Sequence, residues 1–208
     1  MRAAGFPGLI AIRVRAPQVP VRRLRRYIRL VMRFELTPGM KPVDHPDFFR
    51  LPPPPGRSRE SHIVLDESGT FWNGPVRVDH DGMALAFASW IRRHPDDGRY
   101  ILENGYDWTY FTVKDAPFFV RRANPSDEAV LLRLSDGTEE PLDPASLTVS
   151  SDGVLYARVK GGDFDARFFP TAQAGLVDVI VEGPDGEPVV EVSGERFSIR
   201  PRDPVHPC

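Results

Sequence analysis

Turn signals divide the chain from His62 onward into short segments, and they restrict the fold more than any other feature. Asp-Gly, Asn-Gly and Gly-Gly pairs separate runs of aliphatic, aromatic and β-branched residues such as AVLLRL and VLYARV. These dipeptides favour the tight turns of antiparallel hairpins. A chain interrupted this often has no room for long helices, so a β-rich fold is predicted.

Two segments break the β pattern and are predicted to be helices. The segment GMALAFASWIRRHP (82–95) is apolar on almost all sides, which indicates a buried helix with Asp79 or Asp81 as its N-cap. The segment TAQAGLVDVIVEG (171–183) begins at the capping residue Thr171 and ends at Gly183. The predicted class is therefore α+β, with two β-rich units that each contain one main helix.

Composition shifts divide the chain into a basic, proline-rich tail, two units and a short proline-rich end. The expected bounds are 1–59, 60–123, 124–201 and 202–208. Few apolar contacts are expected from the first tail, so it should add little to stability. The similar order of elements in the two units, and the echo between NGYDWTYF (104–111) and GGDFDARF (161–168), predict an internal duplication.

The beginning of the chain is strongly basic, with nine arginines and no acid before Glu35. Within it, VRRLRRYIRLVMRF (21–34) places Val21, Leu24, Ile28 and Val31 on one helical stripe. Three explanations stay open. The segment is a basic amphipathic helix for a membrane surface or an acidic partner, or an organelle transit peptide, or the true start is Met32 or Met40.

Charge and motifs exclude several classes of function. A net charge of -2 disfavours nucleic-acid binding, and no apolar run is long enough for a transmembrane helix. The single cysteine, Cys208, fits a reducing compartment, so a cytoplasmic protein is expected. The five histidines lack metal-ligand spacing, and no phosphate-binding glycine loop or nucleophile elbow occurs. No metal or cofactor is predicted.

The order of several motifs resembles the bacterial family called domain of unknown function twelve-eighty-five (DUF1285). The motifs lie within residues 63–200 and read DESGTFWNGPVR, GRYILENGYDWTYFTVKDAPFF, YARVKGGDFDARF and VEVSGERFSI. The resemblance implies an α+β fold with a duplicated core and a second domain loosely similar to pleckstrin-homology barrels. It also implies a nucleotide-type ligand between the domains and a part in signal transduction.

The chain departs from the family pattern at two cationic positions. Asp107 keeps the carboxylate of an acid-lysine pair, but Trp108 replaces the lysine, and Pro170 stands where the pattern has an arginine. The loss of two cations predicts a ligand different from that of the family, or none.

The leading hypothesis is a small-molecule-binding regulatory protein with its site between the two units. Asp115, which precedes Ala-Pro-Phe-Phe, is expected at this site with Arg77 as its cationic partner. The full predicted set is Arg77, Asp107, Trp108, Asp115, Lys160 and Arg167. A set of few polar groups among apolar walls is typical of small-molecule sites.

Two other classes of function remain. One is a hydrolase that uses carboxylates such as Asp79, Asp107 or Asp115, although no nucleophile-base pair can be assembled. The other is a protein-interaction module. The oligomeric state is left open.

Overall fold

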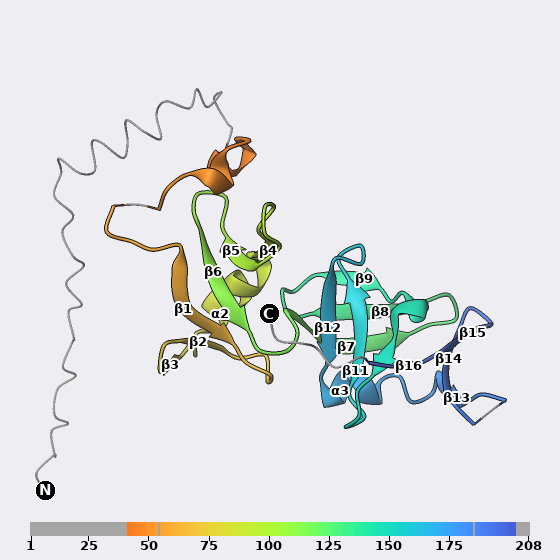
Figure 1. Cartoon of the computed structure of the whole chain (residues 1–208). Coiled ribbons are helices and arrows are strands. Elements are labelled where there is room, and N and C mark those ends of the chain that lie inside the picture. Colours follow the sequence, from red (N-terminus) through yellow and green to blue (C-terminus); the bar gives the residue numbers. More distant parts are fainter. Residues whose placement is uncertain (1–40, 54, 185, 203–208) are drawn as a thin grey trace, which may run out of the picture.

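The computed structural model describes residues 41–53, 55–184 and 186–202. Two sheets lie beside each other and are joined by the linker 114–117 (Figure 1). The predicted basic helix at 21–34 and the end of the chain from 203 lie outside the described residues. The α+β class is confirmed, since helices and sheets both occur and most of the regular structure is β.

The first sheet has six strands in the order β3-β2-β1-β6-β5-β4. β1 and β6 pair in parallel at its centre, and the other neighbours are antiparallel. Helix α2 (Asp81–Ser89) links β3 to β4. The strands are β1 (Glu60–Leu65), β2 (Phe71–Asn73), β3 (Val76–Arg77), β4 (Ile91–Arg93), β5 (Tyr100–Glu103) and β6 (Trp108–Val113).

The second sheet has seven strands in the order β16-β10-β11-β12-β7-β8-β9. A short 3-10 helix, η3 (Pro144–Ser146), links β9 to β10, and α3 (Pro170–Ala174) follows β12. The strands are β7 (Phe118–Pro125), β8 (Val130–Leu134), β9 (Glu139–Pro141), β10 (Thr148–Val149), β11 (Leu155–Val159), β12 (Phe164–Phe168) and β16 (Arg200–Pro201). A third sheet contains β13 (Ile180–Glu182), β14 (Pro188–Val192) and β15 (Glu195–Ser198).

Six strands of the second sheet follow the same order and directions as the first. The order β9-β8-β7-β12-β11-β10 corresponds to β3-β2-β1-β6-β5-β4. The central pair is parallel in both, with Leu65 opposite Val113 and Val120 opposite Phe168. The two echoing segments also run through equivalent hairpins, β5–β6 and β11–β12. The helices do not correspond, because α2 lies before the fourth strand whereas α3 lies after the sixth.

The change from one sheet to the next comes earlier than expected. The strand 118–125, which the sequence analysis placed largely in the first unit, pairs with β8 and β12 in the second sheet. Phe118, Phe119 and Val120 are almost completely buried there. The second sheet is also open, with β16 and β9 at its edges, so the described residues do not form the closed barrel that the resemblance implied.

Both predicted helices are shorter than expected. α2 ends at Ser89, because the buried Ile91 pairs with Leu102 in the first sheet. Its N-cap is His80, whose Nδ1 accepts from the Met83 backbone N–H at 3.3 Å, and not Asp79 or Asp81. α3 ends at Ala174, and the β-branched residues that follow form β13.

The expectation that the first tail makes few apolar contacts is wrong for its described part. Two 3-10 helices, η1 (Pro42–Asp44) and η2 (Phe48–Arg50), pack against the first sheet. Phe48 is buried against Ile101 and Trp108, and the Trp108 Nε1–H donates to the Phe48 carbonyl at 3.4 Å. The sequence did not predict these aromatic contacts, because the segment is rich in arginine and proline.

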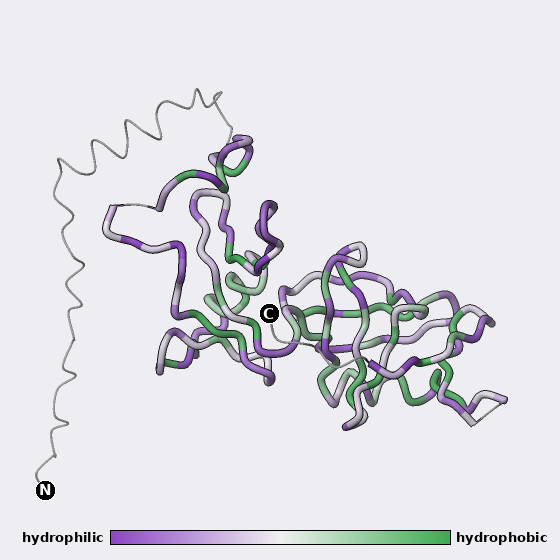
Figure 2. Tube along the Cα trace, in the orientation of Figure 1, coloured by the Kyte–Doolittle hydropathy of each residue, from purple (hydrophilic) through white to green (hydrophobic). Residues whose placement is uncertain are grey.

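One apolar core continues from the first sheet into the second. Apolar segments recur along the strands of both sheets (Figure 2). Phe164 of β12 stacks on Tyr100 of β5 at 6.3 Å and meets Phe118 edge-on at 5.2 Å. The two units therefore share buried surface and do not merely follow each other along the chain.

Candidate functional site

The six predicted site residues do not form one site. Arg77 is exposed on the edge strand β3 and pairs with Asp79, with Nε 3.2 Å from Oδ1. Its predicted pairing with Asp115 is wrong, because β2 and β1 lie between β3 and β6, after which Asp115 comes. Sequence spacing did not reveal this strand order.

Asp115 lies in the linker and is held by the second sheet. Its Oδ2 accepts from Arg167 Nη1 at 2.8 Å and from the Tyr156 hydroxyl at 2.9 Å. The Arg202 guanidinium lies over the Tyr156 ring at 3.8 Å from its centroid. Burial raises the pKa of Tyr156 to about 12, helped by the hydrogen bond to Asp115 and the charge of that carboxylate. Asp115 and Arg167 therefore lie together, whereas the sequence predicted Arg77 as the partner of Asp115.

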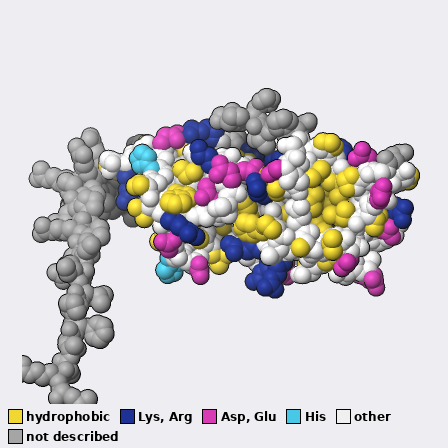
Figure 3. All heavy atoms as spheres, turned by 90° about the horizontal axis from the view of Figure 1, so that it is seen from below, with side chains coloured by type: hydrophobic (Ala, Val, Ile, Leu, Met, Phe, Trp, Pro, Cys, Tyr) yellow, Lys and Arg dark blue, Asp and Glu magenta, His cyan; other side chains and the backbone are white. Residues whose placement is uncertain are grey.

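A cavity of about 650 Å³ lies at the junction of the two units, and Arg167 lines it. Glu67 and Ser68 enter it from the turn between β1 and β2, whereas its other lining residues come from the second unit. Phe168 and Phe169 contribute an apolar floor. Figure 3, seen from below the view of Figure 1, shows hydrophobic side chains gathered on this side of the second unit, where α3 and β13 lie. Val177, which also lines the cavity, is 69% exposed.

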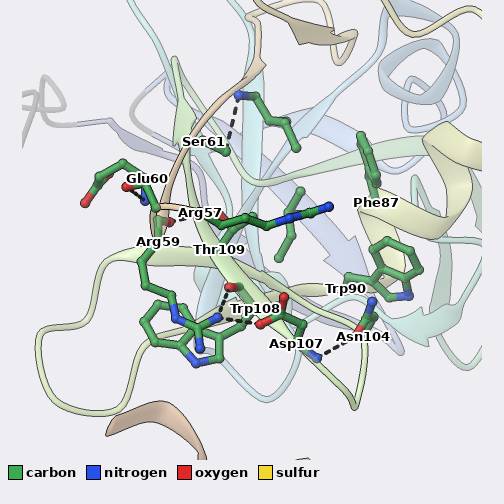
Figure 4. Close-up of a pocket in the computed structure, with 13 residues that line it drawn as sticks. Arg57, Arg59, Glu60, Ser61, Phe87, Trp90, Asn104, Asp107, Trp108 and Thr109 are labelled. Carbon is green, nitrogen blue, oxygen red and sulfur yellow. Dashed lines mark hydrogen bonds and ion pairs between the residues drawn. The ribbon is translucent and has the colours of Figure 1, made fainter. Parts of the chain in front are cut away.

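Asp107 and Trp108 line a different cavity, of about 480 Å³, within the first unit (Figure 4). The Asp107 carboxylate accepts from Arg59 Nη1, and the Arg59 guanidinium lies over the buried Trp108 ring at 4.3 Å from its centroid. Arg59 Nη2 also donates to the carbonyls of Leu51 and Pro52. Sequence reasoning missed Arg59 because it assigned this residue to the tail, and an arginine just before a strand is a weak signal.

Lys160 lines neither of these cavities. Its Nζ lies 2.7 Å from Asp136 Oδ2, and its backbone N–H donates to Glu140. Lys160 therefore fixes the β8–β9 turn to the β11–β12 turn. Its positive φ of 56° marks it as a turn residue.

Neither a metal-binding group nor a membrane-spanning helix occurs in the described ranges. Across residues 41–53, 55–184 and 186–202, His, Cys, Asp and Glu side chains do not gather in any group suited to a metal ion. Within the same ranges, no helix has the length and apolar character needed to cross a bilayer.

Solved structures with a similar fold include DUF1285 family proteins, the family that the sequence motifs resemble. A DUF1285 family protein from Silicibacter pomeroyi matches with a TM-score of 0.55 and 17% identity, over 68% of this chain and 81% of that chain. A DUF1285 family protein from Shewanella baltica matches with a TM-score of 0.46 and 19% identity, over 58% of this chain and 94% of that chain. No family model matches the sequence, and no curated protein matches it. The fold assignment rests on the first structure. At the level of the fold, the predicted resemblance to the DUF1285 family is confirmed.

Proposed function

We propose that this chain, with the fold of a DUF1285 family protein, is a regulatory protein that binds a small molecule at the junction of its two units. The observation that carries the proposal is the cavity lined from both units and containing Arg167. Its volume of about 650 Å³ lies within the usual range of ligand pockets, about 300–1,000 Å³. Apolar walls with a few polar groups suit such a ligand.

The charges at this cavity favour a ligand without several negative charges. Arg167 is the cation among its lining residues, and Glu67 and Asp152 are acids. The described lining therefore carries a net charge of -1, from one positive and two negative side chains. A nucleoside or a neutral metabolite fits this balance better than a nucleoside polyphosphate, which the two acids would repel.

The linker offers a means of regulation. Asp115 lies between β6 and β7 and binds the same arginine that lines the cavity. A ligand that accepts hydrogen bonds from Arg167 would compete with Asp115. Ligand binding would then loosen the linker from the second sheet, and a partner protein could sense that change.

A pair of variants tests the proposal. Asp115→Asn removes the charge that holds Arg167, so we expect it to lower the free energy of unfolding by about 1–3 kcal/mol and to tighten binding of an acceptor ligand. Arg167→Leu should abolish the binding. A thermal-shift screen of the full chain against nucleosides, nucleotides and other metabolites supplies the ligand. Binding that is unchanged in Arg167→Leu would contradict the proposal.

The alternative functions gain no specific support. The hydrolase hypothesis used Asp79, Asp107 and Asp115, and each of these carboxylates is bound to an arginine side chain. An interaction module is compatible with the apolar surface around the exposed Val177 (Figure 3), but nothing in that surface identifies a partner.

We also infer that the two units arose by duplication. The support is the shared order and direction of β1–β6 and β7–β12, with the parallel pair at the centre of each. Superposition of the two sets of strands tests this inference. Strand sets that cannot be overlaid, despite their common order, would reject it.

A further inference from the structure

We propose that the cavity in the first unit is a second ligand site, and that it takes a small organic anion with a flat, apolar body. All its described lining residues belong to the first unit or to the segment leading into β1. It shares no lining residue with the junction cavity. The ligand proposed for this cavity is therefore independent of the small molecule proposed for the junction cavity.

The charge balance of this cavity leaves one arginine uncompensated. Two acids line it, and both are already paired. Arg99 binds Glu60 through two nitrogens at 2.9 and 2.8 Å, and Arg59 binds Asp107. Arg57 has no hydrogen bond or ion pair with any residue in the described part of the chain. Its side chain extends into the middle of the cavity (Figure 4).

Asn104 adds a second donor with a fixed orientation. Its Oδ1 accepts from the backbone N–H groups of Tyr106 and Asp107 at 3.0 and 2.9 Å. The oxygen is therefore occupied, and the Nδ2 group has no acceptor among the described residues. In Figure 4 the Asn104 side chain lies next to Trp90 at the edge of the cavity.

Trp90 adds a third donor. The indole N–H groups of the other two tryptophans are used, since Trp72 donates to Asp66 at 2.7 Å and Trp108 to the Phe48 carbonyl at 3.4 Å. No acceptor is found for Trp90 Nε1 among residues 41–53, 55–184 and 186–202. A guanidinium, an amide and an indole N–H thus line one cavity without protein acceptors. An anionic oxygen group satisfies such donors, and bonds to charged groups are the strongest.

The remaining wall is apolar and aromatic. Phe87 and Trp90 come from the end of α2, with ring centroids 5.8 Å apart, and Ile63 and Leu102 complete the wall. Such a surface suits an aromatic or other flat ring. Arg57 is the one free cation in the described lining, so a single carboxylate or phosphate is favoured over a polyphosphate chain.

Titration of the full chain with phenyl phosphate, indole-3-acetate and inorganic phosphate tests the site. In ¹H–¹⁵N spectra we expect the two aromatic anions to shift the Trp90 indole and Asn104 side-chain amide signals. Trp90→Phe identifies the indole signal. Inorganic phosphate should bind at least about 10-fold more weakly, because it has no apolar body. Equal binding of all three anions would overturn the ligand class, and unmoved signals with every anion would overturn the site.

Matched variants separate binding from folding. Arg57→Gln should weaken binding of the aromatic anions about 10-fold or more. Arg133→Gln, an equal change of charge at an exposed position on β8, should leave it unchanged. Asn104→Asp keeps the oxygen that accepts from Tyr106 and Asp107, yet replaces the free donor by a negative charge, so it should fold and lose binding. Unchanged affinity in both Arg57→Gln and Asn104→Asp would reject the proposal.

The junction cavity supplies a further control. Arg167→Leu should leave binding of the aromatic anions at the first-unit cavity unaltered. If Arg167→Leu instead removes this binding, the anion occupies the junction and the second-site proposal is wrong. A metabolite screen that finds no ligand for the junction cavity would not affect this result, because the aromatic anions are tested at residues of the first-unit cavity.

Discussion

At the scale of single residues, the partner of Asp115 shows how tertiary contacts decide the role of a charge. Arg77 is nearer in the sequence, but Arg167 on β12 provides the ion pair, and Tyr156 on β11 adds a hydrogen bond. The Asp115 side chain is 14% exposed and that of Arg167 is 26% exposed. The pair is therefore screened less than a surface salt bridge, and the loss of either partner leaves a charge without compensation.

The raised pKa of Tyr156 predicts that the protein loses stability at alkaline pH. Its pKa in the folded protein is about 12 against an ordinary 10.0, so the native state holds the phenol proton more tightly than the unfolded chain. The resulting contribution to the free energy of unfolding is intact below pH 10 and is lost as the pH rises from 10 to about 12. Denaturant unfolding at several pH values measures this slope.

Two tyrosine variants serve that measurement. Tyr156→Phe should reduce the alkaline slope and cost about 1 kcal/mol near neutral pH through the lost hydrogen bond. Tyr106→Phe is the control, because the Tyr106 side chain is 67% exposed. A slope that is the same in Tyr156→Phe and in the original chain would show that other groups cause the alkaline loss. Tyr110, whose pKa is also raised to about 12, is the first of those groups.

At the scale of elements, short segments are fixed by contacts that their own sequence does not display. η2 has three residues and no side-chain cap, yet it is held against the first sheet by Phe48. α3 has five residues and packs under β7. Helices this short are not stable on their own, so tertiary packing sets their position.

Phe48→Ala tests the docking of the segment before β1. Phe48 is 3% exposed, so its truncation should lower the free energy of unfolding by about 3–5 kcal/mol. At about 2–4 °C per kcal/mol, the melting temperature should fall by roughly 10 °C. A deletion up to residue 56 should be at least as damaging, since it also uncovers Trp108. A melting temperature within a couple of degrees of the full chain would mean that the segment is not docked in solution.

Gly175→Ala tests why α3 ends where it does. Alanine is the better helix former by roughly 0.5–1 kcal/mol, so local propensity predicts a gain. However, a Cβ at Gly175 would lie 2.6 Å from the backbone oxygen of Ala123 on β7. Because β7 is buried at the centre of the second sheet, we expect a net loss of about 1–3 kcal/mol in thermal or denaturant unfolding. A gain in stability would mean that the end of β7 can move away.

At the scale of the whole molecule, the shared core couples the two units. Tyr100 and Phe164 stack across the boundary, and the Arg93 guanidinium lies over both rings at 4.6 and 5.4 Å. Gly69 in the first unit closely approaches the rings of Phe119 and Phe169. A boundary with this many aromatic contacts is expected to transmit unfolding from one unit to the other.

Calorimetry of the full chain tests this coupling. We expect one transition whose calorimetric and van't Hoff enthalpies agree. Phe164→Ala should lower the free energy of unfolding by the amount typical of a buried phenylalanine, about 3–5 kcal/mol. If the boundary contacts join the units, the variant should also show a second transition. Two resolved transitions in the unaltered chain would show that the units unfold independently.

The sequence by itself determined the α+β class, the hairpins and the order of motifs that resembles the DUF1285 family. These features are local, since turn dipeptides and the alternation of apolar residues act over a few positions. The sequence also predicted Asp107, Trp108, Asp115 and Arg167 as ligand-binding residues. Each of them is held by a hydrogen bond, an ion pair or burial.

Only the tertiary structure decided which of these residues meet. Asp115 and Arg167 are 52 positions apart, and Asp107 and Arg59 are 48 apart. Their pairing depends on which strands become neighbours, and strand order is set by burial of the whole core. For the same reason β7 joined the second sheet, the helix predicted at 171–183 gave way to β13, and Phe48 of the basic tail became part of the core. Local propensity is small beside the burial of large side chains, so the global packing prevailed at each of these places.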